Sequence, residues 1–268
     1  MIENPETQAM IEETWHTFLT TGGYKTEQRK RRFFRRLPGH QRCKACYAPF
    51  QGVGSNVVRV LYNKRPSVLS PFLCNTCEDF ARTYPGGTEI ELSLLFADVR
   101  GSTTIAESMS PMDFHKLINR FYSTATQVMA NSDALIDKII GDQVAGMYVP
   151  GFAGEHHACR AIEAAQEILE VTGHNNPDGP WISLGVGVHT GTAFVGSLGS
   201  ESGTSDITVL GDTANTAARL STNAGIGEIL VSQSAYRHAG YNGQKIVEQR
   251  QLELKGKSKK ILVNVVTS

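Results

Sequence analysis

Apolar residues near the start of the chain recur at the spacing of a helix with one hydrophobic face. The pattern predicts an amphipathic helix over residues 5–20, because the apolar positions i, i+4, i+7 and i+8 share one face. Such a helix needs a surface that covers its apolar stripe, either on its own chain or on a partner. The residues of the stripe are Ile11, Trp15, Phe18 and Leu19.

A second pattern begins after the sequence YPGG at residues 84–87, whose Pro and Gly residues interrupt regular structure. The segment EIELSLLFADV, residues 89–99, is predicted to be a buried strand. A helix is predicted to follow from Ser110, a suitable N-cap with Pro111 at the first helical position. The apolar stripe of that helix consists of Phe114, Leu117, Phe121, Ala125 and Val128.

The remaining elements alternate in the same way. Residues 138–150 predict a β-hairpin with a turn at Gly141 and Asp142, and a helix is expected over 155–172. Strand, helix, hairpin, helix and strand in this order predict an α+β domain with a ferredoxin-like fold. The later elements predicted are a strand over 181–189, a short turn, a strand over 206–212, a helix capped by Asp212, and strands over 228–232 and 259–266.

Two Cys-x-x-Cys pairs, separated by 27 residues, precede this domain. In a cytosolic chain, where thiols stay reduced, the spacing favours a four-cysteine metal site over disulfides, with one structural zinc ion per chain as the expected occupant. An iron–sulfur or redox-sensing role is the alternative. The first pair lies in a knuckle-like segment and the second opens a predicted helix, so we expect a small treble-clef-like unit. The four ligands are Cys43, Cys46, Cys74 and Cys77.

These patterns divide the chain into three predicted parts. Residues 1–40 contain the amphipathic helix and a basic segment, and residues 41–86 form the four-cysteine, zinc-binding-like unit. Residues 87–268 form the α+β domain.

Charge is unevenly distributed, although the formal net charge of the chain is zero. Residues 24–46 contain nine Lys or Arg against Glu27 alone, a local charge of +8. A solvated helix face is the plainest interpretation, and nucleic acid, an anionic membrane or the chain's own acidic surface are alternative partners for this basic N-terminal segment. No apolar run approaches the roughly 18 residues of a membrane span, and the acidic N-terminus differs from a signal peptide, so we expect a cytoplasmic protein.

Two aspartates stand at the ends of predicted strands. Asp98 lies near the end of the first strand, and Asp142 lies at the tip of the hairpin. In a ferredoxin-like sheet this tip can lie beside the end of the first strand, so the two carboxylates could share a cation such as magnesium bound with a nucleoside triphosphate. The backbone N–H groups of the loop that follows the first strand could cradle phosphates. The residues of that loop are Gly101, Ser102 and Thr103.

Three further polar residues are candidates for substrate contacts. Lys138 precedes Asp142 by four residues, a separation of some ~13 Å along a strand, so it is expected to serve a different pocket. Asn215 and Arg219 are four residues apart on one face of a predicted helix, and an amide beside a guanidinium suits a ribose and a triphosphate. A solvated helix face is the alternative for this pair.

Five motifs, taken together, resemble the catalytic domain of class III nucleotidyl cyclases. The resemblance covers roughly residues 88–268, and five motifs in order and in register are far more specific than a lone Gly-rich loop. The motifs are LFADVRGST, DKIIGDQVAGMYVP, GVGVHTGTAFVGSLG, TVLGDTANTAARL and ELKGKSKKILVNVV.

The resemblance implies a head-to-tail homodimer with two active sites at the subunit interface. It implies that Asp98, Asp142 and the Val99 carbonyl of one subunit bind two magnesium or manganese ions per site. The other subunit would use Asn215 to orient the ribose and Arg219 to stabilise charge on the reacting phosphate. The remaining residues that the resemblance assigns are the base-reading Lys138 and Thr208 and the polyphosphate-binding Lys255.

Two positions depart from the common pattern of this family. Thr208 stands where many members carry an aspartate, a pattern found in one bacterial-type subgroup of adenylate cyclases, several of which respond to bicarbonate. Thr192 stands where some members carry a phosphate-binding arginine.

The predicted activity is conversion of ATP to 3′,5′-cyclic AMP and pyrophosphate. Lys138 can only donate and the Thr208 hydroxyl can accept, which matches the N1 acceptor and N6 donor of adenine, whereas guanine reverses both groups. Cytosine repeats the adenine pattern on a smaller ring, so a pyrimidine (CTP or UTP) cyclase is an alternative, as is a guanylate cyclase. An alternative of another class is an inactive nucleotide-binding module whose zinc unit binds nucleic acid or a partner protein.

Overall fold

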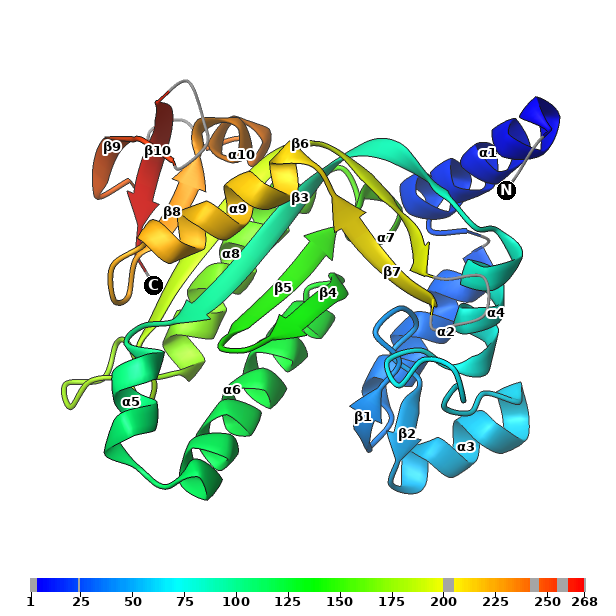
Figure 1. Cartoon of the computed structure of the whole chain (residues 1–268), viewed down its shortest axis with the longest axis horizontal. Helices are drawn as coiled ribbons and strands as arrows, with labels where there is room; N and C mark the ends of the chain where they lie inside the picture. Colours follow the sequence, from blue (N-terminus) through cyan, green and yellow to red (C-terminus); the bar gives the residue numbers. More distant parts are fainter. Residues whose placement is uncertain (1–3, 24, 200–204, 242–245, 255–259, 268) are drawn as a thin grey trace. The chain divides into compact units, whose positions relative to one another are not determined.

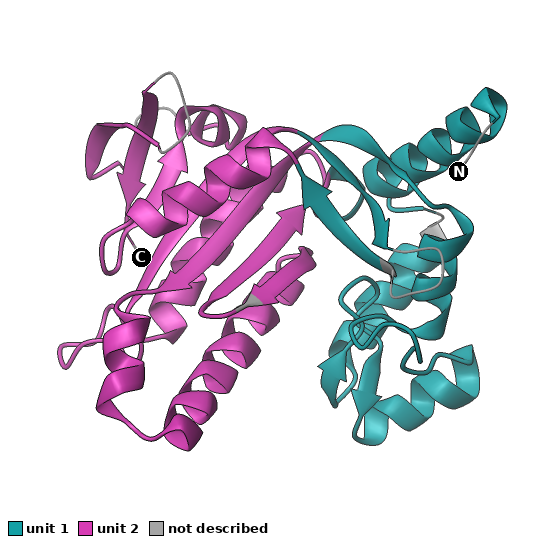
Figure 2. Ribbon diagram, viewed as in Figure 1, with its two compact units in different colours: residues 1–90, 150–152, 193–210 teal, residues 91–149, 153–192, 211–268 magenta. Residues whose placement is uncertain are grey.

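The chain forms two compact units, coloured separately in Figure 2. The computed structural model describes residues 4–23, 25–199, 205–241, 246–254 and 260–267. Unit 1 comprises residues 1–90, 150–152 and 193–210, and unit 2 comprises residues 91–149, 153–192 and 211–268. In the part of the chain described here, no helix is both long and apolar enough to cross a membrane.

Unit 2 is built around a mixed β-sheet (Figure 1). The sheet follows the order β4-β5-β3-β6-β8-β10-β9, so the first strand of the domain, β3, lies between the hairpin and β6, as in a ferredoxin-like sheet. Its antiparallel pairs include β3 with β5, and β6 pairs in parallel with β8. The strands are β3 (Gly87–Val99), β4 (Leu135–Ile140), β5 (Gln143–Tyr148), β6 (Leu184–Gly199), β8 (Ile229–Ser232), β9 (Glu248–Leu252) and β10 (Ile261–Val266).

Helices of unit 2 bury their apolar faces on this sheet and on each other. Helix α6 (Pro111–Asn131) packs against α8 (His157–Val171) and against β4 and β5. Ser110 caps α6 as expected, because its hydroxyl accepts a hydrogen bond from the Asp113 backbone N–H. The other helices of unit 2 are α5 (Ser102–Ser108), α9 (Asp212–Asn223) and α10 (Gln233–His238).

The apolar stripe of α6 is only partly the predicted one. Phe121, Ala125 and Val128 are buried as expected, whereas Phe114 and Leu117 are half-buried. Ile118 and Met129 complete the buried face instead.

Several predicted boundaries differ from the structure. The expected turn after residue 189 is wrong, because β6 continues without interruption to Gly199 and its last part pairs with β7 (Ser205–Leu210). The helix expected over 155–172 begins at His157 and follows a separate short helix, α7 (Pro150–Ala153). Asp212 is the first helical residue of α9, and Gly211 occupies the N-cap position instead.

The hairpin of β4 and β5 is confirmed, with one irregularity. Gly141 adopts a positive φ of 62° at the turn, a conformation that glycine tolerates best. The pairing register shifts between Ile136 and Lys138, as in a β-bulge, so the side chains of β4 do not alternate strictly along its length.

Unit 1 contains the N-terminal helices and the cysteine pairs. Helix α1 (Pro5–Thr21) buries Ile11, Trp15 and Leu19, and the Trp15 indole donates a hydrogen bond to the Tyr84 carbonyl at 2.9 Å. The Trp15 ring also packs edge-on against Phe80, with 5.0 Å between ring centroids. The chain itself therefore covers the predicted apolar stripe. The other elements of unit 1 are α2 (Lys25–Arg36), β1 (His40–Arg42), β2 (Pro49–Gln51), α3 (Val53–Tyr62) and α4 (Asn75–Thr83).

The basic segment forms helix α2, and its arginines lie in two different environments. Arg29, Arg32 and Arg36 are exposed. Arg31 is buried, with its guanidinium 4.6 Å from the centroid of the Tyr47 ring and 4.2 Å from that of the Phe152 ring. Cation–π contacts therefore anchor one face of this helix within unit 1.

Stability should fall as the pH drops below about 6.5, because one buried and one half-buried histidine in unit 2 resist protonation. Burial lowers the pKa of His157, whose Nδ1 lies 2.9 Å from the Ser93 hydroxyl, and burial also lowers the pKa of His174. A histidine with a lowered folded-state pKa binds its proton first in the unfolded chain, so acidification favours unfolding. We expect the free energy of unfolding, measured in urea from pH 7.5 to 5.5, to fall with decreasing pH.

The slope of that decrease should become shallower in His157→Gln, by at most about 1.4 kcal/mol per pH unit for one proton. His115→Gln, which removes an exposed imidazole from α6, is the control and should keep the wild-type slope. An unchanged slope in His157→Gln would contradict this assignment.

Candidate active site and cysteine cluster

The two candidate metal-binding aspartates lie where the C-terminal end of β3 meets the turn before β5. Strand β3 pairs with β5 so that Asp98 is directly opposite Gln143. The backbone N–H of Val99 donates to the Asp142 carbonyl at 3.0 Å, which fixes the hairpin tip beside the end of β3. Residues 44 positions apart in the sequence thus meet at one place.

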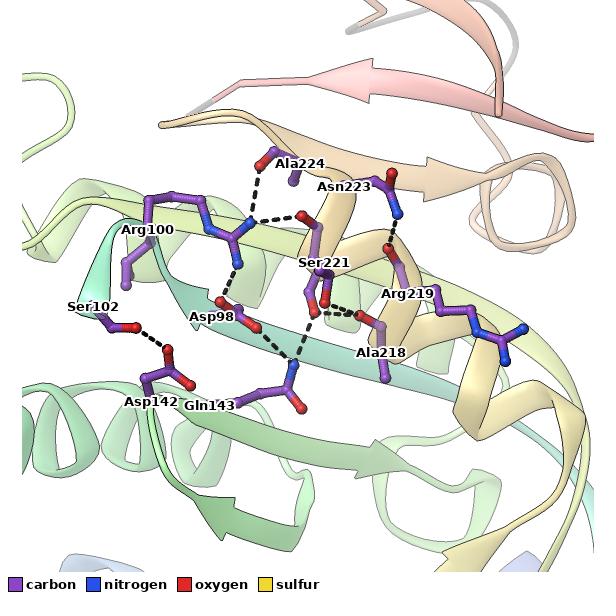
Figure 3. Close-up of polar contacts among 12 residues, drawn as sticks. Asp98, Arg100, Ser102, Asp142, Gln143, Ala218, Arg219, Ser221, Asn223 and Ala224 are labelled. Atoms are coloured by element: carbon purple, nitrogen blue, oxygen red, sulfur yellow. Dashed lines mark hydrogen bonds and ion pairs between the residues drawn. The ribbon is translucent and has the colours of Figure 1, made fainter. Parts of the chain in front are cut away.

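Asp98 is partly buried, and the guanidinium of Arg100 balances its negative charge (Figure 3). Burial is the main cause that raises the pKa of this carboxyl; Asp142 raises it further, and Arg100 opposes the shift. The Arg100 guanidinium forms an ion pair with Asp98 Oδ1, and the Gln143 side-chain amide donates to Asp98 Oδ2 at 3.0 Å. Both oxygens of Asp98 are therefore held by neighbouring side chains.

The loop after β3 leads directly into helix α5. Gly101 occupies the N-cap position with a φ of 67°, a conformation that favours glycine. The Ser102 hydroxyl donates to the Asp142 carboxylate, whereas Thr103 is exposed. Of the three loop residues proposed to contact phosphate, Ser102 therefore touches a metal-ligand candidate.

Helix α9 presents the predicted Asn and Arg pair. Asn215 is exposed and Arg219, one helical turn later, is half-buried. At its other end the helix approaches the aspartates, since the Gln143 amide donates to the Ser221 hydroxyl at 3.1 Å (Figure 3). The Arg100 guanidinium donates to the Thr222 carbonyl at 2.7 Å.

The remaining predicted contacts are spread over the chain. Lys138 is half-buried on β4 of unit 2, just after the bulge, whereas Thr208 is buried on β7 of unit 1, where it pairs with Gly196. Thr192 is exposed, and its carbonyl accepts a hydrogen bond from the Thr213 hydroxyl at 2.5 Å. Lys255 lies outside the described residues.

Sequence reasoning missed three side chains of this network, Arg100, Gln143 and Ser221. The contact of Gln143 could have been found from the antiparallel pairing of the first strand with the hairpin. This pairing places Gln143 opposite Asp98, and cross-strand neighbours on one face of a sheet contact each other. The contacts of Arg100 and Ser221 depend on how α9 packs, which no local pattern specifies.

The four predicted cysteine ligands in unit 1 converge. Their Sγ atoms all lie within 4.8 Å of one another, and those of Cys46 and Cys74 are 3.7 Å apart. Four sulfurs placed at about 2.3 Å from a tetrahedral zinc ion lie about 3.8 Å from one another. The spacing of Cys46 and Cys74 therefore fits such an ion.

Local structure explains how this cysteine cluster forms. Cys43 and Cys46 lie in the turn between β1 and β2, where the Tyr47 N–H donates to the Cys43 carbonyl at 2.8 Å. Cys74 is the N-cap of α4, and Cys77 lies in its first turn. The Cys74 backbone N–H donates to Cys43 Sγ at 3.3 Å. The turn between β1 and β2 and the start of α4 thus each contribute two cysteines.

A buried lysine accompanies the cysteines. Lys64 is 7% exposed, and its ammonium lies 3.7 Å from Cys74 Sγ. Burial works against its charged form, yet the four neighbouring cysteines together raise the pKa of Lys64. Hydrogen bonds from the other three cysteines, together with this ammonium, lower the pKa of Cys74. These contacts favour the thiolate form at Cys74, the form that binds a metal ion, whereas hydrogen bonds with neighbouring cysteines raise the pKa of Cys46 and Cys77.

Comparison with known proteins places unit 2 and part of unit 1 in a known group. Residues 88–267 match the family described as the adenylate and guanylate cyclase catalytic domain. The chain is 33% identical to adenylate cyclase 1 of Rhizobium meliloti (strain 1021) over 135 residues, which is 48% of this chain and 20% of that protein. It is 30% identical to the adenylate cyclase of Anabaena cylindrica over 153 residues, 55% of this chain and 30% of that protein.

A solved structure shares the fold. The guanylyl cyclase Cya2 superposes with a TM-score of 0.60 at 23% identity, over 68% of this chain and 93% of that one. This likeness supports the α+β catalytic fold with a mixed sheet. The chain spans less than a third of the length of the two relatives named above.

Proposed function

This chain belongs to the adenylate and guanylate cyclase catalytic domain family, and from that premise we propose that it converts ATP to 3′,5′-cyclic AMP and pyrophosphate at sites shared by a head-to-tail homodimer. The observation that carries the proposal is the meeting of Asp98 and Asp142 at the joined ends of β3 and the hairpin. The same unit presents Asn215 and Arg219 on one helix, so a single chain contains both halves of the required chemistry.

The aspartate pair fits a divalent cation. Carboxylate oxygens are the ligands that magnesium and manganese prefer, and the pKa of Asp98 is raised by burial and by the charge of Asp142. A cation between the two groups relieves this repulsion. Asp98, Asp142 and the Val99 carbonyl are the proposed ligands. Two divalent cations held there would supply the acidity that activates the ribose 3′ hydroxyl and the charge that holds the polyphosphate.

The residues of α9 act on the substrate in this proposal. The ribose 3′ hydroxyl gives its proton to the substrate phosphate, to water or to Asp98, its oxygen forms a bond with the α-phosphorus, and the bond to pyrophosphate breaks. Asn215 fixes the ribose so that the 3′ oxygen is aligned for attack, and the fixed positive charge of Arg219 offsets the charge that develops on the phosphate. The loop from Gly101 to Thr103 and Lys255 contact the phosphates.

Arg219 suits the charge-stabilising role because it is half-buried. A partly desolvated guanidinium interacts more strongly with a phosphate than a fully hydrated one does, and its planar fork can donate two hydrogen bonds at once. Asn215, by contrast, is exposed on the same face, where a substrate can reach it.

The base is selected by hydrogen-bond matching. Lys138 donates to adenine N1, and the Thr208 hydroxyl accepts from the exocyclic amine. Thr208 is 5% exposed, so a mismatched base would face a buried residue that water cannot readily reach. In the homodimer both residues come from the subunit that supplies α9. CTP and UTP are the second candidate substrates, and GTP is disfavoured.

The cysteine cluster of unit 1 is proposed to hold one structural zinc ion. Four thiolates fill a tetrahedral coordination shell and leave no open position for a substrate. Zinc bound there would link the turn between β1 and β2 to the start of α4. Lys64 offsets part of the negative charge of the four thiolates.

Asp98→Ala and Asp142→Ala should each abolish cyclisation of all four nucleoside triphosphates, because each removes a proposed ligand. Activity is measured by mass spectrometry of the products formed with magnesium or manganese. Asp178→Ala, the same substitution at an exposed position, should keep wild-type activity. Near wild-type turnover in either ligand variant, with a folded protein by circular dichroism, would contradict the assignment of that aspartate as a metal ligand.

Lys138→Glu should lower kcat/KM for ATP by about 10² or more, as expected when a hydrogen bond to the base is replaced by a mismatched pair. Adding Thr208→Cys should open some GTP turnover, since glutamate accepts from guanine N1–H and a thiol donates weakly to O6. ATP, GTP, CTP and UTP are assayed in parallel. Unchanged ATP selectivity in Lys138→Glu would show that this lysine does not contact the base. A preference of the wild type for CTP would refute the assignment of adenine as the base and would leave the proposed cyclase activity intact.

Purified protein should contain one zinc ion per chain by elemental analysis. Cys77→Ser should lose the metal and lower the stability of unit 1, because zinc binding and folding are coupled in small metal sites. Cys159→Ser, which removes the fifth cysteine on α8, is the matched control and should keep its zinc. Metal-free wild-type protein, or the visible absorbance of an iron–sulfur cluster, would overturn this proposal.

A further inference from the structure

The proposed metal ligand Asp98 is connected to helix α9 by two side chains, and this connection has a consequence for catalysis. Gln143 is the cross-strand neighbour of Asp98, and its side-chain amide donates to Asp98 Oδ2 at 3.0 Å and to the Ser221 hydroxyl at 3.1 Å (Figure 3). One amide group thus spans from the end of β3 to the last turn of α9.

Arg100 makes a second, parallel connection. Its guanidinium pairs with Asp98 Oδ1 and donates to the carbonyls of Thr222 and Ala224, at 2.7 and 3.4 Å. These carbonyls lie at the negative end of the α9 macrodipole, where a cation is favourable. Its backbone N–H donates to the Ser183 carbonyl at 2.8 Å, so the main chain of Arg100 is also fixed.

Burial makes this network stiff. The side chains of Arg100 and Asp98 are 17% and 15% exposed, and Ser221 is fully buried. Removing the partner of a polar group in such surroundings destabilises the protein, because water cannot fully replace that partner. A displacement of α9 therefore moves the partners of both Asp98 oxygens.

We infer that Gln143 and Arg100 are positioning residues that couple metal binding at Asp98 to the placement of α9. The inference rests on the proposed function for its metal ligands. Coupling of this kind is reciprocal, so α9 affects metal affinity, and bound metal in turn orders α9. In the proposed homodimer Asn215 and Arg219 of this helix serve the second site. Metal bound at one site would therefore help to assemble the other.

Ser221 provides the cleanest test, because it touches neither the metal nor the proposed substrate. Its neighbour Thr222 is a matched control: both hydroxyls donate to the Ala218 carbonyl, but only that of Ser221 contacts Gln143. Arg100 is less suitable for a test, since its loss changes the charge beside the metal ligands.

The experiment measures manganese affinity by electron paramagnetic resonance on the 268-residue chain. Asp142→Ala first identifies the relevant site by loss of its binding. Gln143→Met should weaken binding at that site by about 10-fold, as is usual for partners of metal ligands, and Ser221→Ala by about 3-fold. Thr222→Ala should bind as the wild type does.

Two additional measurements separate coupling from general damage. The double variant Gln143→Met/Ser221→Ala should bind manganese no more weakly than Gln143→Met alone, because both substitutions break the same link. Manganese should slow hydrogen exchange of the amides at residues 220–224 in the wild type, and should do so less in Gln143→Met.

The outcomes distinguish the inference from the function on which it rests. Wild-type affinity in Ser221→Ala, or equal weakening in Ser221→Ala and Thr222→Ala, would overturn the coupling while leaving the metal site intact. Absence of any Asp142-dependent manganese binding in the wild type would contradict the proposed function and the inference together.

Discussion

The pairing of β3 with β5 is the constraint on which the candidate active site depends. It places Asp98 opposite Gln143 and joins the backbone N–H of Val99 to the carbonyl of Asp142. Two carboxylates from distant parts of the chain therefore meet at the end of β3. A shift of one residue in this register would turn every side chain of β5 to the other face. Val144 and Ala145 point to opposite faces of β5 and are both buried, so such a shift would exchange the side chains that pack on its two faces.

The candidate active site also disfavours the folded state, because it brings two carboxylates of like charge together where they are partly buried. Arg100 and Gln143 occupy the two oxygens of Asp98, and the Ser102 hydroxyl contacts Asp142. These partners hold the carboxylates in place before any cation arrives. Gln143 and Arg100 also contact α9, so the elements that would bind metal and those that would stabilise the phosphate are parts of one network.

Much of this arrangement could be predicted from the sequence. The strand ending near Asp98, the hairpin turn at Gly141 and the cap at Ser110 follow from local rules of burial, turn geometry and capping, and the structure confirms all three. The convergence of the four cysteines followed from their spacing, because metal-binding sites impose a fixed ligand geometry.

Other features had no local signal. The continuation of β6 to Gly199 depends on its pairing with β7, since Gly191, Gly196 and Gly199 disfavour a strand by themselves. The shift in register near Asp137 depends on how β4 packs on its neighbours. Lys64, which lies between the two cysteine pairs in the sequence, reaches the cluster through the fold of the unit.

The central claim is that each active site combines Asp98 and Asp142 of one subunit with Asn215 and Arg219 of the other. Complementation tests it most directly. Asp142→Ala and Arg219→Ala proteins, each inactive alone, are mixed under conditions where subunit exchange is confirmed by native mass spectrometry. The account predicts that activity returns, at most to about half the wild-type rate, because the heterodimer keeps one of two sites intact. Complete exchange with no return of activity would contradict it.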